Sequence, residues 1–331
     1  MRLIEHNITK STIIGLTAAI IAAALFGMVS TIAKPVLSTV DAFLLSSLVY
    51  LISAIFFSSI VVLTNNIPSS SFLSSLQTYS SYRKRRYYIL VIVTSIIGAA
   101  IAPAMFFVGL RQTTASNTSL LANGETIFSI MLAILFFKEK LKPLGYLAAL
   151  MVLAGLVVVT TNLQFHSSLF EINSGNILVL GATALWGLDN NICRFVIYRM
   201  DIARLVQIKS AVGGGILLTF AAFVLHVPLN MDVIKIPHIV VLGAVCFGTS
   251  LYFFLISMKR IGIVRSVLVI SLSSVFGLIF ASLFLGELIS TQQIIAVVVM
   301  LAGIYLINIE KENAKRGNII TSIEETDFKD K

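Results

Sequence analysis

Glu125 is a single carboxylate in the middle of a long apolar stretch. It is the only charged residue between positions 113 and 137, and it directly follows Asn123 and Gly124. An ionised carboxylate at the centre of a bilayer costs about 2.5–3.5 kcal/mol on insertion scales, so it should face a neighbouring helix or a hydrated cavity. Burial also disfavours the charged form, so the group can take up a proton. We predict that Glu125 and Asn123 line a cavity that binds a ligand or exchanges protons; the alternative is a structural tie to a neighbouring helix.

Asp189 and Lys209 are two further charges inside apolar segments that follow one another along the chain. At roughly 1.5 Å per helical residue they lie at similar depths, about 13 Å and about 10 Å from the same side of the membrane. An internal repeat of the sequence pairs them with Val29 and Val49, both apolar, which indicates that the two charges were gained together. One prediction is therefore an ion pair. The other is that Lys209 extends to the membrane surface and leaves Asp189 alone in the cavity.

Aromatic and amide side chains near these charges are further candidates for a binding site. Trp186, Asn190 and Asn191 surround Asp189 in the sequence, and Tyr252 lies in a later apolar segment. An apolar or aromatic ligand would pack against Trp186 and Tyr252, while the amides fix its polar end. Phe106 could take part in the same way, although ordinary helix packing is the simpler interpretation for it.

The sequence shows no residue arrangement typical of an enzyme. No phosphate-binding GxxxxGK[ST] loop is visible, so transport driven by ATP on this chain is not expected. Cys193 and Cys246 both lie in apolar runs and predict neither a disulfide framework nor a metal site. We expect a protein that is not an enzyme and that uses no cofactor. Four histidines are scattered without paired spacing: His6, His166, His226 and His238.

The composition indicates that lipid is the solvent of this chain. Charged residues make up 12% of the 331 residues and apolar residues 57%, whereas a soluble domain carries about a quarter charged residues; the mean hydropathy is +0.97. We predict an all-α integral membrane protein with ten transmembrane helices, each close to the roughly 17–25 residues needed to cross the hydrocarbon core. The apolar segments lie near residues 12–33, 42–63, 87–109, 114–137, 144–161, 176–198, 203–225, 236–257, 263–285 and 290–309.

The distribution of Lys and Arg predicts the orientation. If the N-terminus is cytoplasmic, that side carries most of the basic residues, and the outer side has little beyond Lys34, Arg111 and Lys235. Both termini are therefore expected in the cytoplasm, and the net charge of +9 reflects topology rather than nucleic-acid binding. Segment 64–86, which is Ser-rich and ends in RKRR, is expected as a cytoplasmic loop. Residues 310–331 are expected to form a disordered cytoplasmic tail.

The chain contains two similar halves. ALFGMVSTIAKPVLSTVD (24–41) aligns without gaps on ALWGLDNNICRFVIYRMD (184–201), an offset of 160 residues. LFFKEKL (135–141) aligns on LFLGELI (283–289), an offset of 148 residues. We predict one five-helix repeat over residues 1–161 and a second over 174–309. Because five is an odd number, the two repeats would cross the membrane in opposite directions, an arrangement typical of secondary transporters.

These paired motifs resemble a known family. The ALFG and ALWG openings, the FFKE and FLGE turns and the two LAG tripeptides are similar to those of the drug/metabolite transporter superfamily, in particular its ten-helix EamA-type branch. The resemblance covers roughly residues 12–309. It implies a central cavity lined by helices 1, 3, 4, 6, 8 and 9, and export or exchange of small metabolites. Many members carry a Glu-Pro pair in the fourth helix; Glu125 matches the Glu, but Thr126 replaces the Pro, so a proline kink is not implied.

We therefore expect a secondary transporter of the cell membrane that exports small metabolites, amino acids or amphipathic compounds by alternating access. Coupling to protons through Glu125 is a hypothesis. The expected partners are a small-molecule substrate, the lipid bilayer and protons, and not nucleic acid; no particular oligomeric state is predicted. One alternative is an exchanger of nucleotide sugars or phosphorylated sugars, which would need several cations to bind phosphate. The other is a membrane scaffold or receptor that transports nothing.

Overall fold

The regular elements of the structure are helices. The computed structural model describes residues 2–63, 81–137, 173–228 and 232–303, together with 305–306 and isolated positions between 143 and 155. Helices satisfy their backbone hydrogen bonds internally, as a chain in lipid requires. The described elements are α1 (Arg2–Val36), α2 (Ala42–Leu63), α4 (Ser81–Ile96), η1 (Ile97–Ile101), α5 (Ala102–Gln112), α6 (Ala115–Leu121), α7 (Gly124–Phe137), α9 (Ser174–Val196), α10 (Ile202–Thr219), η2 (Phe220–Val224), η3 (Val233–Lys235), α11 (Ile236–Val241), η4 (Leu242–Thr249), α12 (Ser250–Ile261), α13 (Ile263–Ile270) and α14 (Ser273–Leu285), followed by the helix Thr291–Gly303.

Six stretches of the described chain are long and apolar enough to cross a membrane: Ser11–Val36, Ala42–Leu63, Tyr87–Gln112, Ile202–Val224, Val233–Ile261 and Arg265–Leu285. The helix α9 has 23 residues, but its cluster Asp189, Asn190 and Asn191 lowers its hydropathy. The predicted fourth segment forms two shorter helices, α6 and α7. Most of the predicted fifth helix (144–161), the end of the tenth and the tail 310–331 lie outside the described residues.

The predicted cytoplasmic loop 64–86 is shorter than expected at its C-terminal end. The helix α4 begins at Ser81, so the RKRR run forms its first turns. No Gly or Pro lies between residues 81 and 96, and Arg, Lys and Tyr are all tolerated in helices. Residues 64–80 lie outside the described part of the chain.

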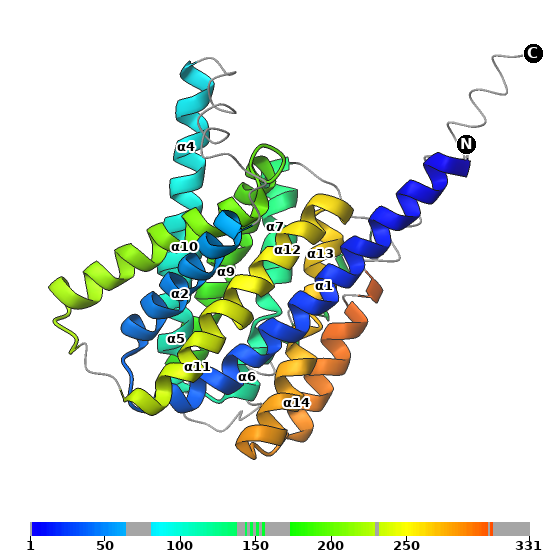
Figure 1. The fold of residues 1–331 in the computed structure, drawn as a ribbon. Coiled ribbons are helices and arrows are strands. Elements are labelled where there is room, and N and C mark those ends of the chain that lie inside the picture. Colours follow the sequence, from blue (N-terminus) through cyan, green and yellow to red (C-terminus); the bar gives the residue numbers. More distant parts are fainter. Residues whose placement is uncertain are drawn as a thin grey trace, which may run out of the picture.

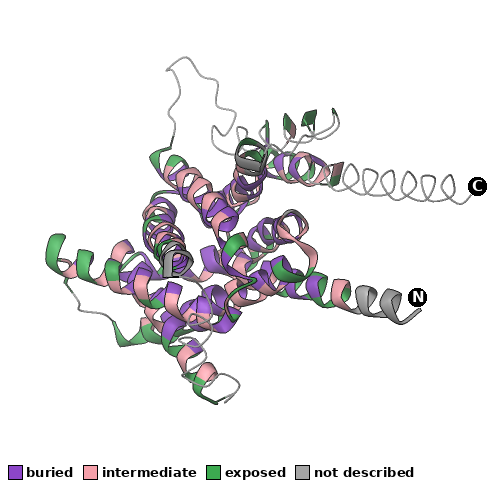
Figure 2. Ribbon diagram, turned by 90° about the horizontal axis from the view of Figure 1, so that it is seen from above, coloured by how far each residue is buried: buried purple, intermediate pink, exposed green. Residues whose placement is uncertain are grey.

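The helices pack side by side in one bundle (Figure 1). Seen from above, buried residues gather on the faces turned toward neighbouring helices, and exposed residues lie on the outer faces and at the ends (Figure 2). Several exposed side chains are large and apolar, for example Phe223 at 76%, Leu283 at 73% and Ile55 at 66% of their full exposure. Such an outer surface suits contact with lipid chains rather than water.

Matching interruptions occur in the two halves. The helix α6 ends at Leu121 and α7 begins at Gly124, while α13 ends at Ile270 and α14 begins at Ser273. With the 148-residue offset of the repeat, the first residue of α6 corresponds to the first residue of α13. The π-helical turns η1 and η4 interrupt the preceding span of each half in the same way. The repeat in sequence is therefore also a repeat in local backbone structure.

The helices α1 and α9, which begin the two halves, run in opposite directions. The last turn of α1 and the first turn of α9 both contact the end of α5. Lys34 Nζ lies 2.8 Å from the Leu110 carbonyl oxygen. A Cβ added at Gly109 or at Gly175 would lie only 2.7 Å from the other residue's carbonyl oxygen, so the backbones of α5 and α9 touch there.

Candidate functional site

A small cavity lies in the middle of the bundle. Its volume is about 50 Å³, enough for a few water molecules. Eight of the predicted spans contribute to its wall, including α2 and α10, which the family resemblance did not imply. The lining residues are Phe26, Tyr50, Gly98, Glu125, Trp186, Asp189, Asn190, Lys209, Phe247, Ser250, Leu251, Phe254 and Ile270.

Along α1 and α9, residues of two hydrophobic clusters flank the cavity lining. Along α1, Ala22 and Ala23 belong to one cluster, Val29 and Ala33 to the other, and the cavity-lining Phe26 lies between them. The same order recurs along α9, where Trp186 joins one cluster, Cys193 joins the other, and Asp189 and Asn190 lie between. On these two helices, the residues that line the cavity therefore lie between buried apolar residues.

Glu125 is held at the interruption between α6 and α7. Its backbone N–H donates to the Ala122 carbonyl at 3.1 Å, which forms the turn. One carboxylate oxygen accepts a hydrogen bond from Asn190 Nδ2 at 2.6 Å. The side chain is half-buried because part of its surface lines the cavity. Its direct partner is thus a neutral amide, and the opposite side of the group is free to meet water or a ligand.

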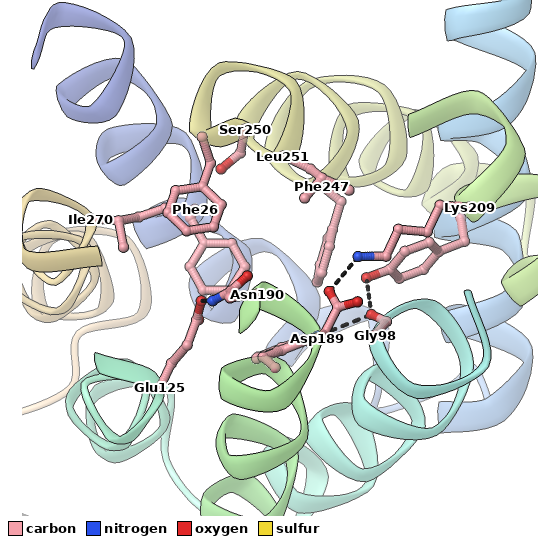
Figure 3. A pocket seen from close by; sticks show the side chains of 13 residues that line it. Phe26, Gly98, Glu125, Asp189, Asn190, Lys209, Phe247, Ser250, Leu251 and Ile270 are labelled. Atoms are coloured by element: carbon pink, nitrogen blue, oxygen red, sulfur yellow. Dashed lines mark hydrogen bonds and ion pairs between the residues drawn. The ribbon is translucent and has the colours of Figure 1, made fainter. Parts of the chain in front are cut away.

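Asp189 and Lys209 form the buried ion pair that the sequence left as one of two alternatives. Their side chains are 5% and 1% exposed. Lys209 Nζ also lies 3.5 Å from Cys193 Sγ. Lys209 therefore points into the bundle rather than to the membrane surface. Figure 3 shows this pair on one side of the cavity, Glu125 with Asn190 on the other, and Phe247 between them.

The carbonyl of Gly98, next to this pair, accepts hydrogen bonds from two aromatic residues. In the π-helical turn η1 each N–H bonds to the carbonyl five residues earlier, as the Ala102 N–H does to the Ile97 carbonyl. The donor for the Gly98 carbonyl would then be Pro103, which has no N–H. Tyr50 Oη and Trp186 Nε1 donate to the Gly98 oxygen instead, at 3.2 and 3.1 Å. The aromatic rings are thereby fixed at the cavity wall.

Gly98 is also the point of closest approach between η1 and α9. A Cβ at this position would lie 2.3 Å from the Asp189 carboxylate. Only a residue without a side chain leaves room for the ion pair here.

Five of the residues predicted for the site line the cavity: Glu125, Trp186, Asp189, Asn190 and Lys209. The structure directs the other three elsewhere. Asn123 donates to Ser274 Oγ at 3.0 Å, which joins the interruptions of the two halves. Asn191 donates to the Ser129 and Gly187 carbonyls, at 3.0 and 2.8 Å. Tyr252 packs on Phe57, with ring centroids 5.3 Å apart.

Several lining residues were missed by reasoning from the sequence. Phe26 could have been found, because the repeat pairs it with Trp186. Tyr50, Phe247 and Phe254 carry no such signal, since aromatic residues are equally common on lipid-facing surfaces. Phe106 does not line the cavity but packs against the lining residue Trp186, with the two ring centroids 5.2 Å apart.

The lining combines aromatic side chains with a few ionisable groups. Among the described lining residues, two are carboxylates and Lys209 is the only cation. Within the described part of the chain, no group of three or more His, Cys, Asp and Glu could hold a metal ion.

Comparison with known proteins identifies the family. The model of the EamA-like transporter family matches residues 13–161 and 173–309. An "Uncharacterized transporter" of Methanothermobacter thermautotrophicus is 29% identical over 294 residues, covering 88% of this chain and 85% of that protein. Another from Synechocystis sp. is 23% identical over 230 residues, covering 67% and 66%. A crystal structure of a protein with 19% identity shares the fold, with a TM-score of 0.65 over 90% of this chain and 98% of that one. The chain therefore belongs to the EamA-like transporter family, within the drug/metabolite transporter superfamily, and is a multi-pass membrane transporter.

Proposed function

We propose that this chain is a secondary transporter that exports small metabolites or amphipathic compounds by alternating access, with Glu125 as the proton-coupling group. The observation that carries the proposal is the position of Glu125: it lies at a helix interruption, lines the cavity and is hydrogen-bonded to an amide rather than to a cation. An ionisable residue inside the membrane that faces a cavity is a functional candidate. Interrupted helices are also where transporters commonly bind substrates and coupling ions.

We infer that the two halves form inverted five-helix repeats, with ten helices in all and both termini in the cytoplasm. The antiparallel course of α1 and α9 supports this topology. The matched interruptions at residues 122–123 and 271–272 support it as well. In such an arrangement, rocking of one half against the other exposes the same cavity to each side of the membrane in turn.

The charges around Glu125 favour exchange of a proton at this residue. Asp189 on α9 and Lys209 on α10 face the cavity and neutralise one another, and Tyr50 on α2 faces it with its hydroxyl bound to Gly98. With Glu125 ionised, the described lining carries one surplus negative charge; with Glu125 protonated, it carries none. Proton uptake therefore removes the unbalanced charge from a site of low dielectric constant, and proton release restores it.

The lining favours amphipathic substrates over phosphorylated ones. Phe26, Trp186, Phe247 and Phe254 offer aromatic surface for an apolar body. A phosphate group would require several cations, whereas Lys209 is the only cation among the described lining residues and is already paired with Asp189. We therefore prefer metabolite export to exchange of nucleotide sugars or phosphorylated sugars.

Reconstitution tests this function. The purified protein in liposomes should move at least one compound of a panel of amino acids and amphipathic metabolites, faster when a pH gradient is imposed. Empty liposomes are one control, and Ser250→Trp, which fills the cavity, is the second; neither should show the flux. Folded protein that moves no member of a broad panel under either condition would instead support a scaffold or receptor.

A further inference from the structure

A tight corner between α5 and α6 is held by two opposite charges from distant parts of the chain. The corner comprises residues 113–116. Lys34, in the last turn of α1, donates to the Leu110 carbonyl at 2.8 Å, to the Arg111 carbonyl at 3.3 Å and to the Thr113 carbonyl. Glu287, which follows α14, accepts from the backbone N–H of Ala115 and of Ser116, both at 2.9 Å, and from Ser116 Oγ at 2.6 Å.

Each charge suits the helix end that it contacts. Lys34 binds carbonyls at the C-terminus of α5, where the helix dipole is negative, and Glu287 binds N–H groups at the start of α6, where it is positive. Charge-assisted hydrogen bonds of this kind are stronger than neutral ones. Gly286 adopts a left-handed conformation with φ of +65°, which ends α14 and turns Glu287 toward the corner. Only glycine enters this region without strain.

The contact with Glu287 joins the two halves of the chain. The corner and Lys34 belong to the first half, whereas Glu287 belongs to the second. Further along α6, Gln293 Nε2 donates to Asn117 Oδ1 at 2.8 Å, and Asn123 bonds to Ser274 at 3.0 Å. The corner is thus the outer end of a polar seam that runs from the surface to the level of the cavity.

The seam lies beside buried apolar residues at the Lys34 end of the bundle. Val29, Ala33, Leu110 and Leu121 have no exposed surface. The helix α6 packs on α14 here, so an opening of the cavity between the two halves at this end would part them along the seam.

We infer that Lys34 and Glu287 form a latch that keeps the cavity closed toward the Lys34 end, and that its release is a step of the transport cycle. The inference rests on the proposed alternating access. Glu287 ties the corner to the second half, and Lys34 fixes the conformation of the corner from within the first half. Both are positioning residues, because neither lines the cavity. The latch therefore governs access to the cavity, and its effect can be measured without any substrate.

Accessibility of a cavity cysteine tests the latch. The reporter is Ser250→Cys, in a background in which the two buried native cysteines are replaced by Cys193→Ser and Cys246→Ala. A membrane-impermeant thiol reagent is added to each face of reconstituted vesicles in turn. Ser38→Cys, an exposed position near the end of α1, identifies the face that corresponds to the Lys34 end.

Glu287→Gln and Lys34→Met should each raise the labelling rate from the Lys34 face by about tenfold, the effect of losing one charge-assisted hydrogen bond. Arg111→Gln is the matched control, because this basic side chain lies at the same end but is 54% exposed and bridges to Asp41 at 3.9 Å; it should leave the rate unchanged. In Lys34→Arg, which retains the charge and the donors, the reporter cysteine should also be labelled slowly.

Unchanged labelling in both Glu287→Gln and Lys34→Met overturns the latch, whether or not the protein transports anything. Because Lys34 and Glu287 are contributed by different segments, two variants keep the test valid if one of them fails to fold. Faster labelling from the Lys34 face in a protein that moves no compound of the panel supports the latch and counts against the proposed function alone.

Discussion

At the scale of single residues, the two carboxylates of the cavity differ in their surroundings. Asp189 is 5% exposed on its side chain and is bound to Lys209, whereas Glu125 is half-buried and is bound to the amide of Asn190. A carboxylate paired with a lysine stays ionised during a cycle, because its protonation would leave the lysine as an unpaired buried cation. A carboxylate whose partner is neutral can gain and lose a proton without leaving a buried cation behind. We therefore assign a structural role to the pair and the exchange of protons to Glu125.

The role of the pair leads to a stability prediction. Lys209→Met leaves Asp189 as an uncompensated buried charge and should destabilise the protein by about 3–5 kcal/mol. In Asp189→Asn/Lys209→Met neither charge remains, so most of that loss should be recovered. Thermal unfolding in detergent, followed by the fluorescence of Trp186, provides the comparison. A double variant as unstable as Lys209→Met would show that the pair is not the reason for the loss.

The polar side chains of the cavity were predictable to the extent that they were charged. Glu125 and Asp189 had to avoid lipid, so their inward orientation followed from the cost of exposing a charge to hydrocarbon. For Lys209 the sequence left two alternatives, because a long side chain can also reach the membrane surface. The neutral amides Asn123 and Asn191 are less constrained. Either can satisfy its hydrogen bonds on any face that offers a carbonyl or hydroxyl, and the structure directs both away from the cavity.

At the scale of elements, interruptions of helices create the site. The turn before Gly124 allows Glu125 to reach the cavity, and the π-helical turn η1 releases the Gly98 carbonyl for Tyr50 and Trp186. The sequence predicted the helices from their apolar length but not these interruptions. The interruption between α6 and α7 lacks the proline that would have predicted it, because Thr126 stands in its place. Pro103 explains the free carbonyl in η1 only when the π-helical hydrogen-bond pattern is known.

Gly98→Ala tests the close approach of η1 and α9. The new Cβ would meet the Asp189 carboxylate at 2.3 Å, so we expect a loss of about 1–3 kcal/mol from overpacking, in addition to disturbance of the ion pair. Gly215→Ala in α10 is the control, because no atom lies within 4 Å of its added Cβ and alanine favours a helix by about 1 kcal/mol. The melting temperature should fall for the first variant and hold or rise for the second. Equal melting temperatures would contradict the packing described.

Asn123, between α6 and α7, and Asn190, on α9, should respond differently to substitution. Asn123→Ala removes the hydrogen bond between the interruptions of the two halves and should lower stability by about 1–2 kcal/mol. Asn190→Ala removes the amide bound to Glu125, so we expect altered dependence of transport on pH. Melting temperature and flux at several pH values, measured on both variants, separate the effects. A purely structural role for Asn190 would leave the pH profile of its variant unchanged.

At the scale of the whole molecule, the cavity is too small to hold a substrate. Its volume of about 50 Å³ is far below the roughly 300–1,000 Å³ of ligand pockets. We therefore expect the helices to move apart before a substrate binds, a motion that two mutually inverted halves would allow. The fold class and the two-part organisation followed from composition and self-similarity. The small size of the cavity did not, because side-chain packing between distant helices decides it.

The central claim is that Glu125 couples flux to protons, and transport by Glu125→Gln in liposomes tests it most directly. For the compound found with the panel, one proton exchanged per molecule gives about tenfold accumulation per pH unit in the wild type. Asp232→Asn, which removes an exposed acid at the start of η3, should behave like the wild type. Glu125→Gln should move the compound at the same rate with and without the gradient. Gradient-driven accumulation by Glu125→Gln at the wild-type level would contradict the account.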